Sequence, residues 1–193
     1  DLKDEERKDY GLCMAALALE DRRRLLDPIL EGAKVNWASL ALAALMKEKL
    51  LRRVLSFNFD NVLLRACGIC AHYPAVYDFS MNPPSEFSYL KPGAIIHLHG
   101  QGSGLVMLNS KKETEDHAEK LEAIFRDTLA NFNLIIIGYS GLADASFAKL
   151  SGIFAGRNRV FWLGYEDDPP EHVKKLEQES SVFHFFGGAD ADR

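Results

Sequence analysis

The stretch "RVLSFNFDNVLLRAC", residues 53–67, decides the fold class because it changes from a strand pattern to a helix pattern within a few letters. Val54 and Leu55 are apolar residues that favour a strand, and "NVLLRAC" has the composition of a helix. Asn58 and Asp60 lie in the turn between the two. Such turns recruit Asn and Asp for local reasons, so the stretch raises the question whether either side chain also faces a ligand.

Segments of the same two kinds alternate along the rest of the chain. Strands are predicted at residues 53–58, 75–80, 94–100, 134–140, 159–165 and 182–186, and helices at 12–26, 36–51, 61–67, 115–132 and 170–178. Because the clearest strands are apolar on both faces, the pattern predicts a parallel sheet that is covered by helices on two sides. We therefore expect an α/β fold with a doubly wound parallel sheet, as a single domain over residues 1–193.

Local signals predict where individual helices begin. Residues 1–35 are expected to be a helical N-terminal part, in which Asp27 followed by Pro28 predicts the start of a new helix. Asn36 predicts the start of the next one. The helix at 115–132 has four apolar residues on one face: Leu121, Ile124, Phe125 and Leu129.

The composition favours a soluble globular protein and argues against several other classes. With 47% apolar and 26% charged residues, the chain can bury a core. A net charge of −5 makes direct nucleic-acid binding an unfavoured interpretation, and the basic clusters at 21–26 and 47–53 are interpreted as solvated helix faces. No apolar run approaches the ~20 residues that span a bilayer, so no membrane association is expected.

The three cysteines do not suggest a disulfide framework. Cys13, Cys67 and Cys70 are an odd number in a chain without a signal peptide, which favours a reducing, cytoplasmic setting. "CGIC" at 67–70 has zinc-knuckle spacing, but no second cysteine pair supplies the remaining ligands. We interpret these residues as free thiols and expect no metal.

Polar motifs follow four of the predicted strands. They are "FNFD" at 57–60, "HLHG" at 97–100, "GYSG" at 138–141 and "LGYE" at 163–166. In doubly wound sheets, ligands bind at the carboxyl ends of the strands. These four turns are therefore the predicted ligand-binding edge.

Three of these motifs, "SFNFDNVLLRACG", "IIHLHG" and "LIIIGYSGLAD", resemble in order and spacing the sirtuin family. The chain is most similar to the divergent prokaryotic branch, the sirtuin-like NAD⁺-hydrolysing domains of anti-phage defence systems. The resemblance covers residues 36 to 190. It implies a Rossmann-like, sirtuin-type domain with NAD as substrate.

The resemblance also implies roles for individual residues. Asn58 and His99 match the catalytic residues of the family, and the matching positions that bind the dinucleotide are Asp60, Gly100, Gly138, Ser140, Gly141 and Gly188. For Asp60 a second interpretation stays open, as the N-cap of the helix at 61–67. Among the matching positions, the turn at 138–141 would touch the phosphates and ribose. Gly188, in "GGADAD", would lie near the adenine.

The chain departs from the family pattern at three places. The first strand with its Gly-rich phosphate turn is missing, and both ends look cut, so we expect a piece of a longer protein. Gly164 stands where the family often has Asn. The zinc-ribbon cysteines of protein-deacetylating members do not follow His99, which favours NAD⁺ cleavage over deacetylation.

The expected chemistry is cleavage of the nicotinamide–ribose bond through an oxocarbenium-like state. A carboxamide such as that of Asn58 can orient ribose hydroxyls or water, because it both donates and accepts hydrogen bonds. An imidazole can take the proton, and His99 is preferred because Gly100 leaves room for close approach. His97 lies two residues earlier and remains an alternative base. The other histidines, His72, His117, His172 and His184, are interpreted as structural, and Asp144 as a helix cap.

The predicted function is therefore an NAD⁺ glycohydrolase acting as the effector domain of an anti-phage defence system. The resemblance implies an oligomer and a regulatory or sensor partner or fused domain. Two alternatives stay open: an NAD-dependent protein lysine deacylase, and a non-catalytic dinucleotide-binding or assembly module.

Overall fold

The structure is a computed structural model that describes residues 9–141, 147, 152 and 158–189 of the 193-residue chain. It divides into two compact units, Asp1–His117 and Ala118–Arg193, which are described separately below. Each unit contains a parallel sheet and α-helices, so the α/β class expected from the sequence is confirmed. The parallel strands are spread over two three-stranded sheets in the described part of the chain.

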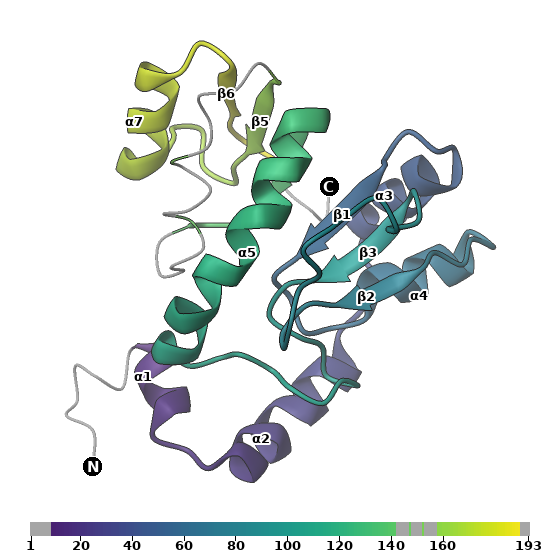
Figure 1. The fold of residues 1–193 in the computed structure, drawn as a ribbon, viewed down its shortest axis with the longest axis vertical. Helices are drawn as coiled ribbons and strands as arrows, with labels where there is room; N and C mark the ends of the chain where they lie inside the picture. The colour runs from purple at the N-terminus through teal and green to yellow at the C-terminus, as the bar shows by residue number, and fades with distance from the viewer. Residues whose placement is uncertain (1–8, 142–146, 148–151, 153–157, 190–193) are drawn as a thin grey trace. The chain divides into compact units, whose positions relative to one another are not determined.

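The sheet of the first unit places two of the polar motifs on neighbouring strands. Its strands are β1 (Arg53–Ser56), β2 (Val76–Asp78) and β3 (Ala94–His97), in the order β1-β3-β2 with both pairs parallel (Figure 1). The central strand β3 is buried at all four residues. The register pairs Ser56 and Asp78 with His97, so all three strands end at one edge.

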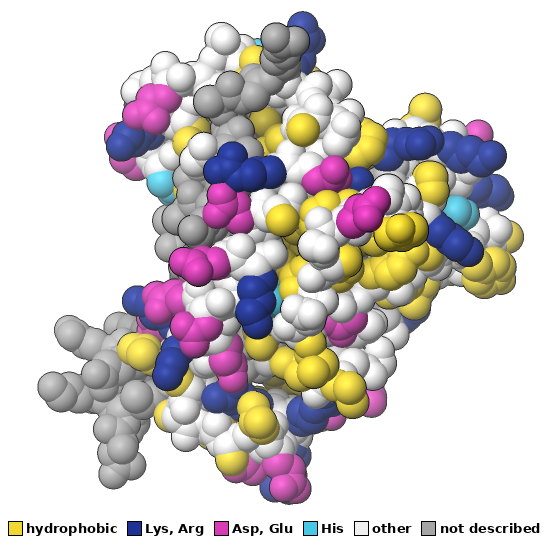
Figure 2. Space-filling model, viewed as in Figure 1, with side chains coloured by type: hydrophobic (Ala, Val, Ile, Leu, Met, Phe, Trp, Pro, Cys, Tyr) yellow, Lys and Arg dark blue, Asp and Glu magenta, His cyan; other side chains and the backbone are white. Residues whose placement is uncertain are grey.

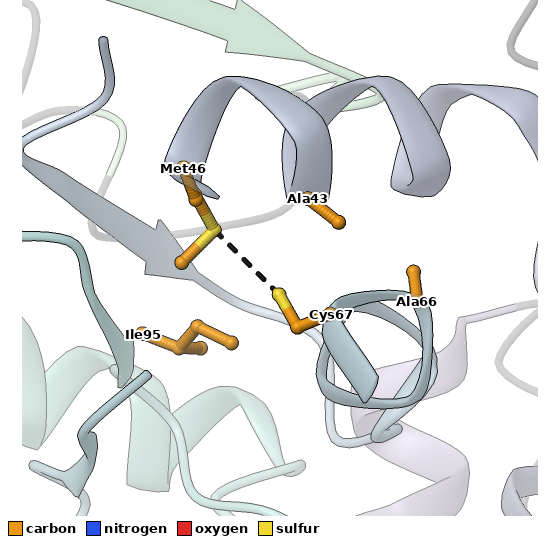
Figure 3. Close-up of a cluster of buried hydrophobic side chains, with 5 residues drawn as sticks. All are labelled: Ala43, Met46, Ala66, Cys67 and Ile95. Carbon is orange, nitrogen blue, oxygen red and sulfur yellow. Dashed lines mark hydrogen bonds between the residues drawn. The ribbon is translucent and has the colours of Figure 1, made fainter. Parts of the chain in front are cut away.

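Two helices of this unit share a core with the sheet. Helix α3 (Trp37–Lys47) packs on α4 (Val62–Ile69), and their buried cluster with β3 consists of Ala43, Met46, Ala66, Cys67 and Ile95 (Figure 3). The Cys67 Sγ lies 3.9 Å from the Met46 Sδ. Burial, together with the neighbouring Cys70, raises the pKa of the Cys67 thiol, so "CGIC" supplies an unreactive packing group at its first cysteine.

The N-terminal helices differ from the prediction. Helix α1 (Tyr10–Ala15) stops early, and α2 (Leu19–Gly32) runs through the expected helix start, with Pro28 inside it. The prediction of a new helix at Asp27 was therefore wrong. Leu26 packs in a buried cluster with Met14 and Met107, and such packing can outweigh the hydrogen bond that a proline lacks.

The start of α3 agrees with the prediction. Asn36 is its N-cap and accepts a hydrogen bond from the Ser39 N–H, while the Ser39 hydroxyl accepts one from the Asn36 N–H. This reciprocal capping box satisfies two backbone donors that the helix itself cannot. The helix ends at Lys47, four residues before the predicted end, and Lys49 then adopts a φ of 61°.

The second unit has a sheet of β4 (Leu134–Ile137), β5 (Val160–Leu163) and β6 (Phe183–Phe186), in the order β4-β5-β6 and parallel throughout. It also includes the C-terminal part of α5 (Lys111–Asn131), which begins in the first unit, and α7 (Glu171–Glu179). The predicted apolar face of α5 is confirmed, because all four of its residues are buried: Leu121, Ile124, Phe125 and Leu129.

Strand β4 differs from the fully buried strand that its sequence predicts. Ile135 is 49% and Ile137 38% exposed, while Ile136 between them is buried. Since β4 is an edge strand of its sheet, a continuous apolar run here does not guarantee burial on both faces.

On the face in Figure 2, acidic and basic side chains lie interspersed with hydrophobic ones. Over the described residues, no helix taken singly has the length and apolar composition of a membrane span. Helices α2 and α3 meet those criteria only as a pair, and a bend of 77° separates them.

Candidate functional site

The carboxyl edge of the first sheet brings the "FNFD" and "HLHG" turns together. Strands β1 and β3 are paired up to Ser56 and His97, and the Leu98 N–H still donates to the Ser56 carbonyl at 2.9 Å. Asn58 and His99 each lie two residues beyond the paired ends. The two predicted catalytic residues therefore follow neighbouring strands at one edge.

The main chain of Asn58 is held on two sides. Its N–H donates to the Ser56 Oγ at 3.2 Å, and its carbonyl oxygen lies 3.1 Å from the His97 Nδ1. The residue itself is exposed, and its carboxamide forms no hydrogen bond with any residue that the structure describes. Asn58 thus presents a polar side chain from a fixed backbone.

Asp60 serves the helix that follows. Its Oδ1 accepts a hydrogen bond from the Val62 N–H at 2.9 Å, at the start of α4. An acidic side chain here also complements the positive end of the helix dipole. The carboxylate is half-buried, and the role that the structure shows for it is to accept a hydrogen bond from the first turn of α4.

His99 lies in a buried group of aromatic rings. Its ring centroid is 5.0 Å from that of Phe57 and 6.3 Å from that of His117, and the residue is 5% exposed. The His117 Nε2 lies 3.0 Å from the Leu98 carbonyl oxygen, which fixes that ring beside the "HLHG" turn. The predicted base is therefore covered, in contrast to the exposed Asn58.

The backbone conformation and the packing of the chain itself require glycine at position 100. Its φ is 98°, and a Cβ at this position would collide with the carbonyl oxygen of Val106, on the strand-like segment that forms a β-bridge through Met107. The sequence interpretation assigned this glycine to ligand approach. The space beside it is filled by the chain's own backbone instead.

Helix α2 holds the loop that follows Gly100. The Arg23 guanidinium donates to three backbone carbonyls, those of Gly102, Gly104 and Leu105, at 3.3, 2.6 and 3.0 Å. Arg22, which is 8% exposed, forms an ion pair with Glu113 at 2.9 Å. The interpretation of residues 21–26 as a solvated helix face was wrong for these two arginines, because sequence cannot show which carbonyls or carboxylates lie opposite a helix.

The predicted phosphate turn lies in the second unit, after β4. Gly138 is exposed with a φ of 64°, Ser140 is exposed, and Gly141 has a φ of 69° and lies against the Phe147 ring. The His172 Nε2 is 2.7 Å from the Ser140 carbonyl oxygen. Sequence reasoning missed this contact, because nothing in the motif links it to a residue 32 positions later.

Gly188 lies where the chain after β6 comes back alongside the "LGYE" turn. Its N–H donates to the Glu166 carbonyl at 3.3 Å, and the Ala189 N–H donates to that of Gly164 at 2.9 Å. A Cβ at Gly187 would collide with the Asp167 carbonyl, so the close approach of these two backbone segments explains why residue 187 is glycine. Asp144 and residues 190–192 of the predicted adenine loop lie outside the described residues.

The chain has no match among known protein-family models or among curated proteins. Within the described ranges, no three His, Cys, Asp or Glu residues are grouped so that they could hold a metal ion.

Proposed function

We propose that the protein is an NAD⁺ glycohydrolase that cleaves the nicotinamide–ribose bond. The proposal rests on the resemblance of its motifs, and one observation carries it further. The exposed Asn58 carboxamide has no internal partner among the described residues, although its backbone is held from both sides. A polar side chain presented in this way at the carboxyl edge of a parallel sheet is suited to bind a ligand.

The reaction needs little from the protein beyond positioning and charge stabilisation. Nicotinamide leaves readily, so the protein must hold the ribose, stabilise the oxocarbenium-like state and direct a nucleophile at the anomeric carbon. The Asn58 carboxamide can orient a ribose hydroxyl or a water molecule through donor and acceptor. The His99 imidazole is proposed to accept the proton, and general-base catalysis of this kind typically contributes ~10²–10⁴ in rate.

The biological setting belongs to the same proposal. By resemblance, the protein acts in the cytoplasm as an effector of anti-phage defence and depletes NAD⁺ when a partner or fused sensor releases it. The products are nicotinamide with ADP-ribose or a cyclised form. No metal takes part in the proposed mechanism.

The decisive test follows nicotinamide release by the purified protein incubated with NAD⁺ and any co-purifying partner. Asn58→Ala and His99→Ala should each lower kcat by about 10²-fold or more. Asn82→Ala is the matched control, because Asn82 is also exposed in the first unit and should leave kcat unchanged. Retention of wild-type kcat by Asn58→Ala would refute the proposed role.

One observation favours a second candidate, a non-catalytic dinucleotide-binding module. His99 is 5% exposed and lies against the rings of Phe57 and His117, which limits the access of a substrate to its imidazole. This candidate predicts NAD⁺ or ADP-ribose binding in calorimetry, abolished by Asn58→Ala, with no nicotinamide released by the wild type.

A further inference from the structure

We infer that His97 is a positioning residue, which holds the Asn58 turn for ligand binding through a ring-to-backbone hydrogen bond and is not the base. This inference rests on the proposed function, since it assigns a role within that site. It also separates the two histidines of "HLHG", which the sequence leaves as alternatives for one role.

The bond fixes the tautomer of the His97 ring. His97 ends β3, is 4% exposed, and its Nδ1 lies 3.1 Å from the Asn58 carbonyl oxygen. A carbonyl oxygen only accepts hydrogen bonds, so the contact requires the proton on Nδ1. In the neutral ring the lone pair then lies on Nε2, and the Nδ1 proton is committed to the turn.

The bond completes a set of three that fix the main chain of the turn. The Ser56 hydroxyl accepts from the Asn58 N–H at 3.2 Å, His97 bonds the Asn58 carbonyl, and the Phe59 carbonyl accepts from the Gly102 N–H at 2.8 Å. Each comes from a different segment, respectively the end of β1, the end of β3 and the loop after Gly100. With both sides of the residue held, only the side-chain rotation of Asn58 remains to be fixed by a ligand.

His97 acts in this scheme through Asn58, without touching the substrate. Losing the bond leaves the Asn58 carbonyl without this donor and lets the turn relax, and a small misplacement of a contact group is costly in catalysis. His99 keeps the base role, since its ring lies beside Phe57 and His117 and is not among the groups that hold Asn58.

The kinetic test compares His97→Asn with His97→Phe in the full-length protein. The Asn side chain can place a donor near the original Nδ1, whereas Phe keeps the ring shape and loses the donor. We expect His97→Phe to lower kcat for nicotinamide release about tenfold or more and His97→Asn to restore most of it. His72→Phe is the matched control, because the buried His72 Nε2 has no hydrogen-bond partner among the residues that the structure describes.

Two further readouts distinguish positioning from a merely structural role or from base catalysis. In an Asn58→Ala background, His97→Phe should have little further effect on kcat, because its route of action is already removed. A general base stops working once it is protonated, so kcat/KM should fall at acid pH. If His97 is not the base, this fall should persist in His97→Phe. An undiminished His97 effect in the double variant, or loss of that acid limb, would overturn the inference.

The bond itself is testable without turnover. Nitrogen-15 NMR of the wild type should show that the neutral His97 ring carries its proton on Nδ1 and its lone pair on Nε2. The opposite tautomer would overturn the inference even in an active enzyme. If the wild type neither binds nor cleaves NAD⁺, the proposed function fails, while the NMR result still decides the His97 bond separately.

Discussion

Gly100 shows how a single residue can be fixed by the chain itself at a site predicted to bind a ligand. It combines a φ of 98° with a position where a Cβ would meet the Val106 carbonyl. A side chain there would strain the backbone and push apart the β-bridge beside His99.

Gly100→Ala should lower the free energy of unfolding by about 2–4 kcal/mol, measured by urea denaturation. Gly93→Ala is the matched control in the same unit, because Gly93 also has a positive φ, 76°, but its Cβ would meet only the Leu51 carbonyl at 3.8 Å. That control should cost about 1 kcal/mol. Equal losses in the two variants would show that the collision at Gly100 relaxes freely.

At this scale the motifs select candidate residues but not their contacts. Asn58 and His99 remain predictions as site residues, and the pairing of β1 with β3 places both after neighbouring strands at one edge. The His97 bond to Asn58 and the His172 contact with Ser140 could not be found, because each depends on which segments become neighbours in three dimensions.

The start of helix α5 is the clearest case at the scale of an element. Ser110 and Glu113 bond reciprocally: the Ser110 N–H donates to the Glu113 Oε2 at 2.9 Å, and the Glu113 N–H contacts the Ser110 Oγ at 3.4 Å. Arg22 from α2 joins them. Burial alone would raise the pKa of the Glu113 carboxyl, but Ser110 and Arg22 outweigh it and hold that pKa below 4.5.

Glu113→Gln should lower the free energy of unfolding by about 1–2 kcal/mol at pH 7, allowing for the partial exposure of the carboxylate. Since the folded pKa is depressed, this contribution is fully present above the unfolded value near 4.5 and is lost as pH falls through the folded pKa. Urea denaturation across pH 3–7 measures it.

The exposed Glu115 supplies the matched control for that series, since Glu115→Gln removes the same charge two residues along the helix. Its effect should stay within about 0.5 kcal/mol at every pH. A Glu113 effect that stays constant down to the lowest pH would contradict the ionic origin of the contribution.

Helix boundaries were predictable where a local signal decides them, as at Asn36, and where periodicity is strong, as on the apolar face of α5. They were not predictable in α2, where Pro28 suggested a break. There the buried contacts of Leu26 with Met14 and Met107 come from elsewhere in the chain.

For the whole molecule, alternation along the sequence predicted the α/β class and the parallel pairing of every described strand. It could not predict that β3 and β5 would be the central strands, or that β4 would expose Ile135 and Ile137. Those properties depend on strand order, which the alternation of elements does not encode.

The role that the sequence resemblance implies for Ser140 is testable by substitution. Ser140→Ala should raise KM for NAD⁺ about fivefold to tenfold with kcat nearly unchanged, since a hydroxyl that binds ribose or phosphate contributes about one hydrogen bond. Steady-state nicotinamide release measures both constants. Ser85→Ala, another exposed serine, should change neither. An unaltered KM in Ser140→Ala would contradict the role that the resemblance implies for Ser140.

The Arg23 contacts have a consequence for how this part of the protein can diverge. Its guanidinium binds main-chain carbonyls of Gly102, Gly104 and Leu105, which every amino acid possesses. Ser103 and Leu105 are both exposed, so substitution of either residue should leave the backbone conformation of the loop unchanged. Replacement of Arg23 by lysine would not be tolerated equally, because one ammonium group cannot reproduce the planar fork. Homologues should therefore vary at positions 103 and 105 while they retain the arginine on the helix opposite.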